Sequence, residues 1–451
     1  MEQKRGSFGS KIGVVMAAAG SAVGLGNIWR FPTEVGNNGG AAFILIYILC
    51  VLLVGVPVMV SEFLIGRHTR ANTITAFRKL APGRWWRIVG IEGVFVAFII
   101  LSYYIIVSGW TLHYTVASLA NQLTADRDYG EYFTHFSSSP WEPVVYAIVF
   151  MGMVHFVIMR GVQNGIEKFS KVMMPMLLLI IGVLVVCSFS MSGFTQGMRF
   201  LLHPDFSKVT ADVVLSAMGQ AFYSLSLAMG CLCTYASYFG SNTNLMKTAS
   251  SVVVIDTIVA VLAGFIIFPA VFSVGVEPNA GPGLVFITLP NVFNMAFHNV
   301  PLIGYVFSGL FYILLMLAAL TSAISLHEPA TAYLNEEWHL SRRTAAWVVS
   351  IGCVVLGVAC SLSMGPWNGF TIGGMCLFDL FDFVSAKVIM PLGGILIALF
   401  TGWYLDRKLV EQEITNNGTL RIPLLRLFFF LTRWIAPLAI TLIFVNELFR
   451  K

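Results

Sequence analysis

The sequence predicts an all-α polytopic membrane protein. Of its 451 residues, 57% are hydrophobic and only 11% are charged, whereas soluble domains carry about 25% charged residues. The apolar residues form stretches of about 20, the length that a helix needs to cross a bilayer. We count eleven such spans, at residues 11–36, 41–66, 88–121, 142–160, 166–190, 213–239, 245–274, 304–337, 342–362, 375–404 and 425–447.

The loops between the spans predict the orientation of the chain. The segment after the second span contains six basic residues and no acid, and the segment after the third has one Arg against Asp126, Asp128 and Glu131. Positively charged loops stay in the cytoplasm. We therefore expect a multi-pass membrane protein with its N-terminus cytoplasmic and, because the span count is odd, its C-terminus outside. The net charge of +5 does not indicate nucleic acid, because the basic residues lie in these short loops.

The first span contains unusual residues for a membrane helix, in the segment AAAGSAVGLGNIWRFP. Gly20, Gly24 and Gly26 lie at mid-membrane depth, and Asn27 and Arg30 follow them directly. Polar groups at this depth are costly and usually functional. The glycines are compatible with a helix-packing seam or with a broken helix whose free backbone groups face a cavity. This segment alone does not decide between the two.

The sixth span repeats the feature, in the segment AFYSLSLAMGCL with Ser224, Ser226 and Gly230 at mid-span. Interrupted helices at matching positions of two halves are the best sequence indicator of a transporter site. The pair therefore favours broken helices, and it divides the chain into a five-helix unit at 1–190 and another at 213–404. The span at 425–447 falls outside the repeat.

Several polar residues deep in the spans are candidates for binding a cation. Unwound carbonyls and hydroxyls suit a hard cation such as sodium, and Ala318, Thr321 and Ser322 share one face of the eighth span. Membrane Thr and Ser also bond to their own helix. Asp256 requires either a cation or a proton. For Glu62, in the second span, we expect bonds from amides that the break in helix 1 frees.

Enzymatic motifs are missing from the sequence. His327 and Glu328 stand in HEPAT, which lacks the second His of the zinc-protease motif HExxH, because position 331 is Thr. There is no nucleophile elbow, phosphate loop or CxxC pair. We therefore expect that the protein is not an enzyme.

The segment GSAVGLGNIWRFP closely resembles the sodium:neurotransmitter symporter family, in particular its bacterial amino-acid transporters. Tyr103–Tyr104, QAFYSLSLAMG, AALTSAI and FITLP extend the resemblance along essentially the whole chain. It implies two inverted five-helix repeats with broken helices 1 and 6. It also implies import of an amino acid with sodium by alternating access, across the plasma membrane of a bacterium.

The resemblance implies a substrate site between the broken helices. The substrate carboxylate would lie at the amides of Leu25 and Gly26 and the Tyr104 hydroxyl. Gly24 stands where monoamine transporters have Asp, so the substrate should carry its own carboxylate. The apolar lining indicates hydrophobic and aromatic L-amino acids. The implied substrate set is Ala22, Gly24, Leu25, Gly26, Ile100, Tyr104, Tyr223, Ser224, Ser226, Met229, Ser322 and Leu326.

Two sodium ions are implied as the co-transported cations. The first would be ligated by Ala22, Asn27, Ser224 and Asp256. The second would be ligated by Gly20, Val23, Ala318, Thr321 and Ser322. Asp256 stands where many family members have Asn, so it should supply the negative charge that chloride supplies in chloride-dependent relatives. We therefore expect transport that is independent of chloride.

The resemblance also implies gates on both sides of the site. Arg30 and Asp382 would close the outside, and Arg5 and Glu336 the cytoplasmic side, where the family usually has Asp in place of Glu336. Gly165 and Pro175 in helix 5 have the spacing that permits local unwinding and release of sodium. Residues 275–303 should form a re-entrant external lid.

Two alternatives to a sodium symporter remain open from the sequence. One is a membrane sensor that binds an amino acid without transporting it. The other is a transporter coupled to protons through His327, Glu328 or Asp256. In each case the expected partners are an amino acid as a small-molecule substrate and the lipid bilayer, and no obligate protein partner is implied.

Overall fold

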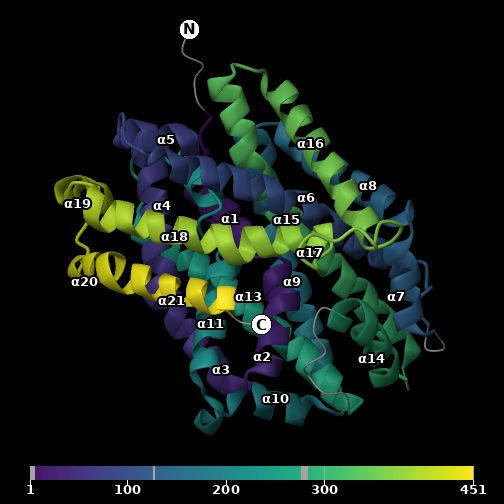
Figure 1. Ribbon diagram of the computed structural model, residues 1–451. Coiled ribbons are helices and arrows are strands. Elements are labelled where there is room, and N and C mark those ends of the chain that lie inside the picture. Colours follow the sequence, from purple (N-terminus) through teal and green to yellow (C-terminus); the bar gives the residue numbers. More distant parts are fainter. Residues whose placement is uncertain (1–5, 125–126, 276–282, 299, 450–451) are drawn as a thin grey trace.

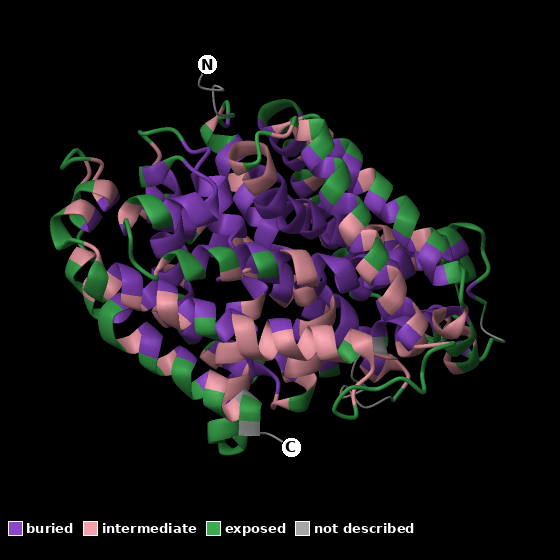
Figure 2. Cartoon of the chain, turned by 45° about the horizontal axis from the view of Figure 1, so that its top comes forward, coloured by how far each residue is buried: buried purple, intermediate pink, exposed green. Residues whose placement is uncertain are grey.

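The computed structural model describes residues 6–124, 127–275, 283–298 and 300–449 (Figure 1). Within these ranges the chain is helical, with no strand beyond an isolated bridge between Ile372 and Met375. Buried residues occupy the centre of the molecule, and the exposed ones gather on the outer helices and loops (Figure 2). Many exposed side chains on the outer helices are large and apolar, among them Leu179 and Val186. Such faces are stable where lipid covers them.

The first half of the chain supplies ten of the labelled helices. They are α1 (Lys11–Ala22), α2 (Phe31–Asn37), α3 (Ala41–Cys50), α4 (Val56–Thr69), α5 (Thr73–Leu80), α6 (Arg87–Leu119), α7 (Tyr129–Ser138), α8 (Glu142–Met159), α9 (Lys168–Ser188) and α10 (Phe194–Leu202). A π-helical turn joins α3 to α4, so the two form one apolar span, Ala41–Thr69.

The second half supplies the remaining helices. They are α11 (Ala211–Ser224), α12 (Cys231–Ala236), α13 (Leu245–Ser273), α14 (Leu289–Ala296), α15 (Pro301–Glu337), α16 (Arg342–Ser363), α17 (Leu377–Asp382), α18 (Met390–Leu399), α19 (Arg407–Ile414), α20 (Leu425–Phe430) and α21 (Ala436–Phe449).

The fold class predicted from the sequence is confirmed. In the described ranges nine helices are long and apolar enough to cross a membrane, and a tenth span results if the bent pair Lys11–Ala22 and Gly26–Asn37 counts as one. The remaining expected span, 213–239, is divided between α11 and α12. These helices are shorter than the length that a single helix needs to cross the bilayer. The inverted five-helix repeat and its boundaries stay a proposal.

Helix 1 is broken where the glycines predicted a break. Helix α1 ends at Ala22, and the next helical segment leaves at an angle of 53°. Gly24 lies in the break, where its amide donates to Asn27 Oδ1 over 2.9 Å. Asn27 is the second residue of the π-helical turn Gly26–Arg30, which continues the helix and precedes α2. The side chain of Asn27 thus satisfies a backbone group that the break leaves without a helical partner.

Helix 6 is broken over the segment between α11 and α12. Three residues there, Ser226, Ala228 and Gly230, have positive φ angles of 52°, 61° and 67°. Two of them are not glycine, and such residues rarely adopt this conformation unless the surroundings hold them. The Ser226 hydroxyl donates to the Ser21 carbonyl over 2.9 Å, which ties this break to helix 1.

The structure corrects the expectation for Glu62. Its Oε1 accepts a 2.7 Å hydrogen bond from the amide of Ala228, which belongs to the break in helix 6 and not to that in helix 1. Helix α4 packs extensively on α12. The sequence shows that helix 2 carries an acceptor, but only tertiary packing decides which of the two breaks lies beside it.

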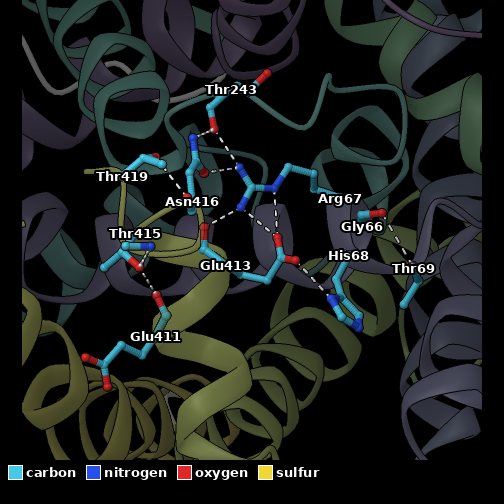
Figure 3. Close-up of polar contacts among 11 residues, drawn as sticks. Gly66, Arg67, His68, Thr69, Thr243, Glu411, Glu413, Thr415, Asn416 and Thr419 are labelled. Carbon is cyan, nitrogen blue, oxygen red and sulfur yellow. Dashed lines mark hydrogen bonds and ion pairs between the residues drawn. The ribbon is translucent and has the colours of Figure 1, made fainter. Parts of the chain in front are cut away.

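A buried arginine joins three segments at the end of α4 (Figure 3). Arg67 is 5% exposed and donates to the Glu413 carboxylate of α19 at 2.6 Å, to Asn416 Oδ1 at 2.8 Å and to the Thr243 carbonyl at 2.5 Å. Burial raises the pKa of the Glu413 carboxyl, but the bonds from His68 and Arg67 outweigh it and hold that pKa below its ordinary value. Glu413 therefore stabilises the fold where it is ionised, and this stabilisation is lost as the pH falls through its lowered pKa.

We expect Glu413→Gln to destabilise the protein by about 3 kcal/mol at neutral pH, because it leaves the buried Arg67 guanidinium without its counter-charge. The thermal unfolding midpoint in detergent measures the effect. Glu411→Gln is the matched control, because Glu411 lies on the same helix and is exposed. The difference between the two variants should vanish in acid, where wild-type Glu413 is itself protonated. Equal midpoints at neutral pH would contradict the assignment.

Candidate substrate and cation site

A cavity lies between the two helix breaks, with a space of about 380 Å³ that includes open solvent. Its lining consists of Ala22, Gly24, Leu25, Gly26, Ile100, Tyr104, Tyr223, Ser224, Ser226, Met229, Ser322 and Leu326. These are the twelve residues that the family resemblance implies for the substrate. The structure therefore brings the whole set together, from helices that are far apart in the sequence.

The polar end of the cavity is formed by backbone groups of the helix 1 break. The amide of Leu25 faces the Tyr104 hydroxyl at 3.5 Å. The helical segment that leads into α2 begins at Gly26, so its partly positive N-terminal end faces the cavity. Gly24 leaves room at this end, because a Cβ there would collide with the Ser322 hydroxyl and lie 3.4 Å from that of Tyr104. The geometry suits a carboxylate group.

The apolar end of the cavity is formed by Ile100, Met229 and Leu326, with the ring of Tyr223. Ile100, Met229 and Leu326 are each no more than 5% exposed. Methionine is flexible and adapts to differently shaped neighbours. This end can therefore hold an apolar or aromatic group.

A buried polar cluster surrounds Asp256 beside the cavity. Asp256 Oδ1 accepts from Asn27 Nδ2 at 2.7 Å, and its Oδ2 accepts from the hydroxyls of Ser224 at 3.0 Å and Tyr47 at 3.2 Å. Asn27, Tyr47 and Asp256 are each 0% exposed. In the described part of the chain no arginine, lysine or histidine pairs with this carboxylate. A negative charge at this place requires a cation as a neighbour.

A second oxygen cluster joins helix 1 to α15. The Val23 carbonyl accepts from the hydroxyls of Thr321 at 3.3 Å and Ser322 at 3.2 Å, and the Thr321 hydroxyl also reaches the Ala318 carbonyl at 3.0 Å. Gly20 packs against Thr321, since a Cβ on it would lie 3.5 Å from that of Thr321.

Both clusters have the donor chemistry that suits sodium. They offer carbonyl, hydroxyl and carboxylate oxygens, which hard cations prefer. The Asn27 amide is oriented with its nitrogen toward Asp256, so rotation of this amide would be needed to offer its oxygen to an ion. The described residues include no group of three or more His, Cys, Asp and Glu of the kind that holds a transition metal.

A larger hollow of about 1660 Å³, including open solvent, adjoins the cavity. Leu25, Gly26, Tyr104 and Tyr223 border both spaces, so the two tyrosines stand between them. Arg30 and Asp382 line the larger hollow. The cavity is therefore reached from this side.

The family model of the sodium:neurotransmitter symporter family matches residues 5–135 and 130–451. The chain belongs to the sodium:neurotransmitter symporter family. It is thus a membrane transporter and not an enzyme.

Two relatives and one solved structure are similar to this chain over nearly their full length. The sodium-dependent transporter YhdH of Bacillus subtilis (strain 168) is 40% identical over 448 residues, which cover 99% of this chain and 98% of that protein. A sodium-dependent transporter of Haemophilus influenzae is 34% identical over 461 residues, covering 99% of each chain. The crystal structure of MhsT in complex with L-phenylalanine is 39% identical, with a TM-score of 0.89 over 98% of this chain and 100% of that one.

The expected outer gate of the symporter is not paired directly in the structure. The Arg30 guanidinium lies over the Tyr223 ring, 4.5 Å from its centroid, and its Nε is 4.0 Å from Glu34 Oε1. Asp382 instead accepts from the Tyr103 hydroxyl at 3.1 Å. A cation over an aromatic face is attracted by the ring electrons. Arg30 therefore stacks on one of the two tyrosines that separate the hollow from the cavity.

The side of the symporter opposite the hollow is closed by the segment before α1. The ring of Phe8 packs edge-on against Tyr235 and Tyr238, and the Phe8 amide donates to the Tyr238 carbonyl at 3.1 Å. Gly9 and Ser10 bond to the Glu167 carboxylate at 2.6 and 3.0 Å. Of the expected inner gate, Arg5 lies outside the described residues.

Glu336, the other expected member of the inner gate, accepts hydrogen bonds from the backbone N–H of Asn72 at 2.9 Å and from its side-chain Nδ2 at 3.0 Å. These bonds join α15 to the start of α5. Gly165 and Pro175 lie in one continuous span, Val162–Ser188, so helix 5 is wound in this conformation.

Sequence reasoning missed several residues of these contacts. Tyr47 touches Asp256, and Tyr103 touches Asp382, yet both look like ordinary apolar-helix tyrosines in the sequence. Glu167, on the π-helical turn before α9, was also missed, although an acid at the start of the expected span 166–190 was a visible signal.

Proposed function

We propose that this protein is a sodium-coupled symporter that imports hydrophobic and aromatic L-amino acids by alternating access, independently of chloride. The observation that carries the proposal is the cavity between the broken helices. One end presents backbone amides and a tyrosine hydroxyl, and the other is apolar. The solved structure of MhsT with L-phenylalanine, a relative of the same fold, supports this class of substrate.

In the proposed complex, the substrate carboxylate lies at the amides of Leu25 and Gly26 and at the Tyr104 hydroxyl. Its amino group meets carbonyls around Ala22, Tyr223, Ser224 and Ser226. The side chain points toward Ile100, Met229 and Leu326. This orientation places opposite charges at the partly positive and partly negative helix ends.

Two sodium ions complete the proposed site. The first is held by the Ala22 carbonyl, Asn27, Ser224 and Asp256, and the second by carbonyls of Gly20, Val23 and Ala318 with the Thr321 and Ser322 hydroxyls. The Asp256 carboxylate balances the charge of the first ion directly. For this reason a separate anion such as chloride is not required.

Alternating access follows from the asymmetry of the conformation. The larger hollow leads to Tyr104 and Tyr223, whereas contacts of Phe8, Ser10 and Glu336 close the opposite side. We assign the hollow to the outside of a bacterial plasma membrane and the N-terminus to the cytoplasm. The change to a conformation open to the cytoplasm would require closure at Arg30 and Asp382, opening around Arg5 and Glu336, and unwinding between Gly165 and Pro175.

Coupling to protons through residues of α15 is disfavoured by their contacts. His327 bonds through both ring nitrogens, to Thr331 and to Ser350. Glu328 forms a two-pronged ion pair with Arg342, at 2.9 and 2.6 Å, and accepts from the Tyr238 hydroxyl. Groups held in this way lack a free position for exchange of a proton with water.

Uptake of radiolabelled L-phenylalanine into proteoliposomes tests the function. We expect accumulation under an inward sodium gradient, undiminished when gluconate replaces chloride. Unlabelled Leu, Met, Tyr and Trp should compete, and Gly, Glu and Lys should not. Binding without accumulation would indicate the sensor, and uptake driven by a pH gradient alone would indicate proton coupling. A requirement for chloride would refute the role of Asp256.

A further inference from the structure

Glu92 is an acid in the second turn of α6 that the proposed transport site does not use. Both of its carboxylate oxygens are buried, and no side chain donates a hydrogen bond to either of them. The carboxyl group lies against the backbone of Gly393 on α18, where a Cβ would come within 2.6 Å of Oε2. Glycine at 393 thus makes the space that the carboxyl group occupies.

The charged group that acts on Glu92 is another carboxyl, that of Glu62 on α4. Glu62 Oε1 accepts a hydrogen bond from the Ala228 amide, and its Oε2 is buried and receives no hydrogen bond from a side chain. A narrow space at this junction is bordered by Glu62, by Val89 and Gly93 on either side of Glu92 in the sequence, and by Gly230. Two like charges at this place would repel each other and would both be poorly solvated.

Titratable groups on the surrounding elements do not supply a counter-charge. Helix α18, Met390–Leu399, has no ionisable side chain. The helix 6 segment contributes Cys231 and Cys233, and α5 contributes Arg78, which pairs with Glu337, and Lys79, which donates to the Thr69 carbonyl. Helix α15, which packs on α6, contributes Glu336, which accepts from Asn72, and Glu328, which pairs with Arg342. His327 of the same helix bonds to Thr331 and Ser350, and Lys387, in the segment that leads into α18, lines the larger hollow.

Helices α8 and α16 contact α6 nearer its middle, α8 at Gly109 and α16 at Phe98. Arg87, at the start of α6, is exposed. No described Arg, Lys or His donates to either oxygen of Glu92. A proton on one of the two carboxyl groups would remove the repulsion between them.

We propose that Glu92, together with Glu62, holds a proton in this conformation and releases it to cytoplasmic water when α6, α18 and the helix 6 break separate. In that step the O–H bond of the carboxylic acid breaks, the electron pair stays on Glu92 as carboxylate, and water accepts the proton. Glu92 is coupled to the helix 6 break because its neighbour Gly93 packs on Gly230. A Cβ added to Gly93 would lie 3.2 Å from the Gly230 nitrogen. Ionised Glu92 would therefore disfavour the conformation in which these helices touch.

The proton itself is tested by infrared spectroscopy on the purified full-length protein, which needs no transport activity. We expect a carbonyl band of a protonated carboxyl group that shifts in D₂O, is missing from Glu92→Gln and changes position in Glu92→Asp. Glu131→Gln, an exposed acid on α7, is the matched control and should keep the band. If the band is the same in wild type and both Glu92 variants, the proposal is overturned.

The link to the cycle rests on the proposed function and is tested by sodium-dependent binding of L-phenylalanine at pH values from acidic to alkaline. Because Glu92→Gln resembles the protonated acid, its half-saturating sodium concentration should equal that of wild type in acid. In alkali it should be lower than that of wild type. The ratio of the wild-type to the variant half-saturating sodium concentration should change by up to about tenfold per pH unit. A ratio that is constant with pH would overturn the link. Absence of phenylalanine binding in wild type would instead count against the proposed function alone.

Discussion

Asp256→Ala should abolish sodium-dependent binding of L-phenylalanine, with a loss of about a hundredfold or more in sodium affinity, or roughly 2.7 kcal/mol. The reason is that Asp256 is the fully buried carboxylate in the cluster with Asn27 and Ser224, and its charge should balance the first sodium ion. A scintillation-proximity binding assay with increasing sodium measures the effect.

Asp256→Asn separates the charge of this residue from its size. It retains the volume and one oxygen, so a loss nearly as large as that of Asp256→Ala would assign the effect to the charge. Asp379→Ala is the control, because Asp379 lines the outer hollow and is not part of the cavity lining. Wild-type sodium affinity in Asp256→Ala would show that the carboxylate is not a ligand.

Gly24→Ala should weaken L-phenylalanine binding by roughly five- to 150-fold, which corresponds to the 1–3 kcal/mol that overpacking usually costs. The added Cβ would collide with the Ser322 hydroxyl and lie 3.2 Å from Ser322 Cβ. It would also intrude at the end of the cavity where we place the substrate carboxylate. Competition binding at saturating sodium measures the change.

Gly182→Ala provides the matched control for Gly24→Ala. Gly182 lies inside α9, and a Cβ there meets no atom within 4 Å, so binding should be unchanged. The same substitution in a helix interior generally stabilises by up to about 1 kcal/mol. If Gly24→Ala bound L-phenylalanine as tightly as Gly182→Ala, the carboxylate would have to lie elsewhere.

The sequence by itself determined the class of the fold and the positions of the two helix breaks. Long apolar stretches can satisfy their backbone in lipid only as helices, so the spans follow from composition. The breaks follow from Gly20, Gly24 and Gly26 and from the matching segment around Ser226 and Gly230. These signals are local, and local signals can be read along a chain.

The tertiary structure decided which distant groups meet. The partner of Glu62 turned out to be Ala228 of helix 6, and Tyr47 joined the Asp256 cluster without any sequence signal. Arg30 stacks on Tyr223 while Asp382 bonds to Tyr103. Such pairings depend on the rotation and tilt of each helix, which the packing of neighbouring side chains sets and which no single segment encodes.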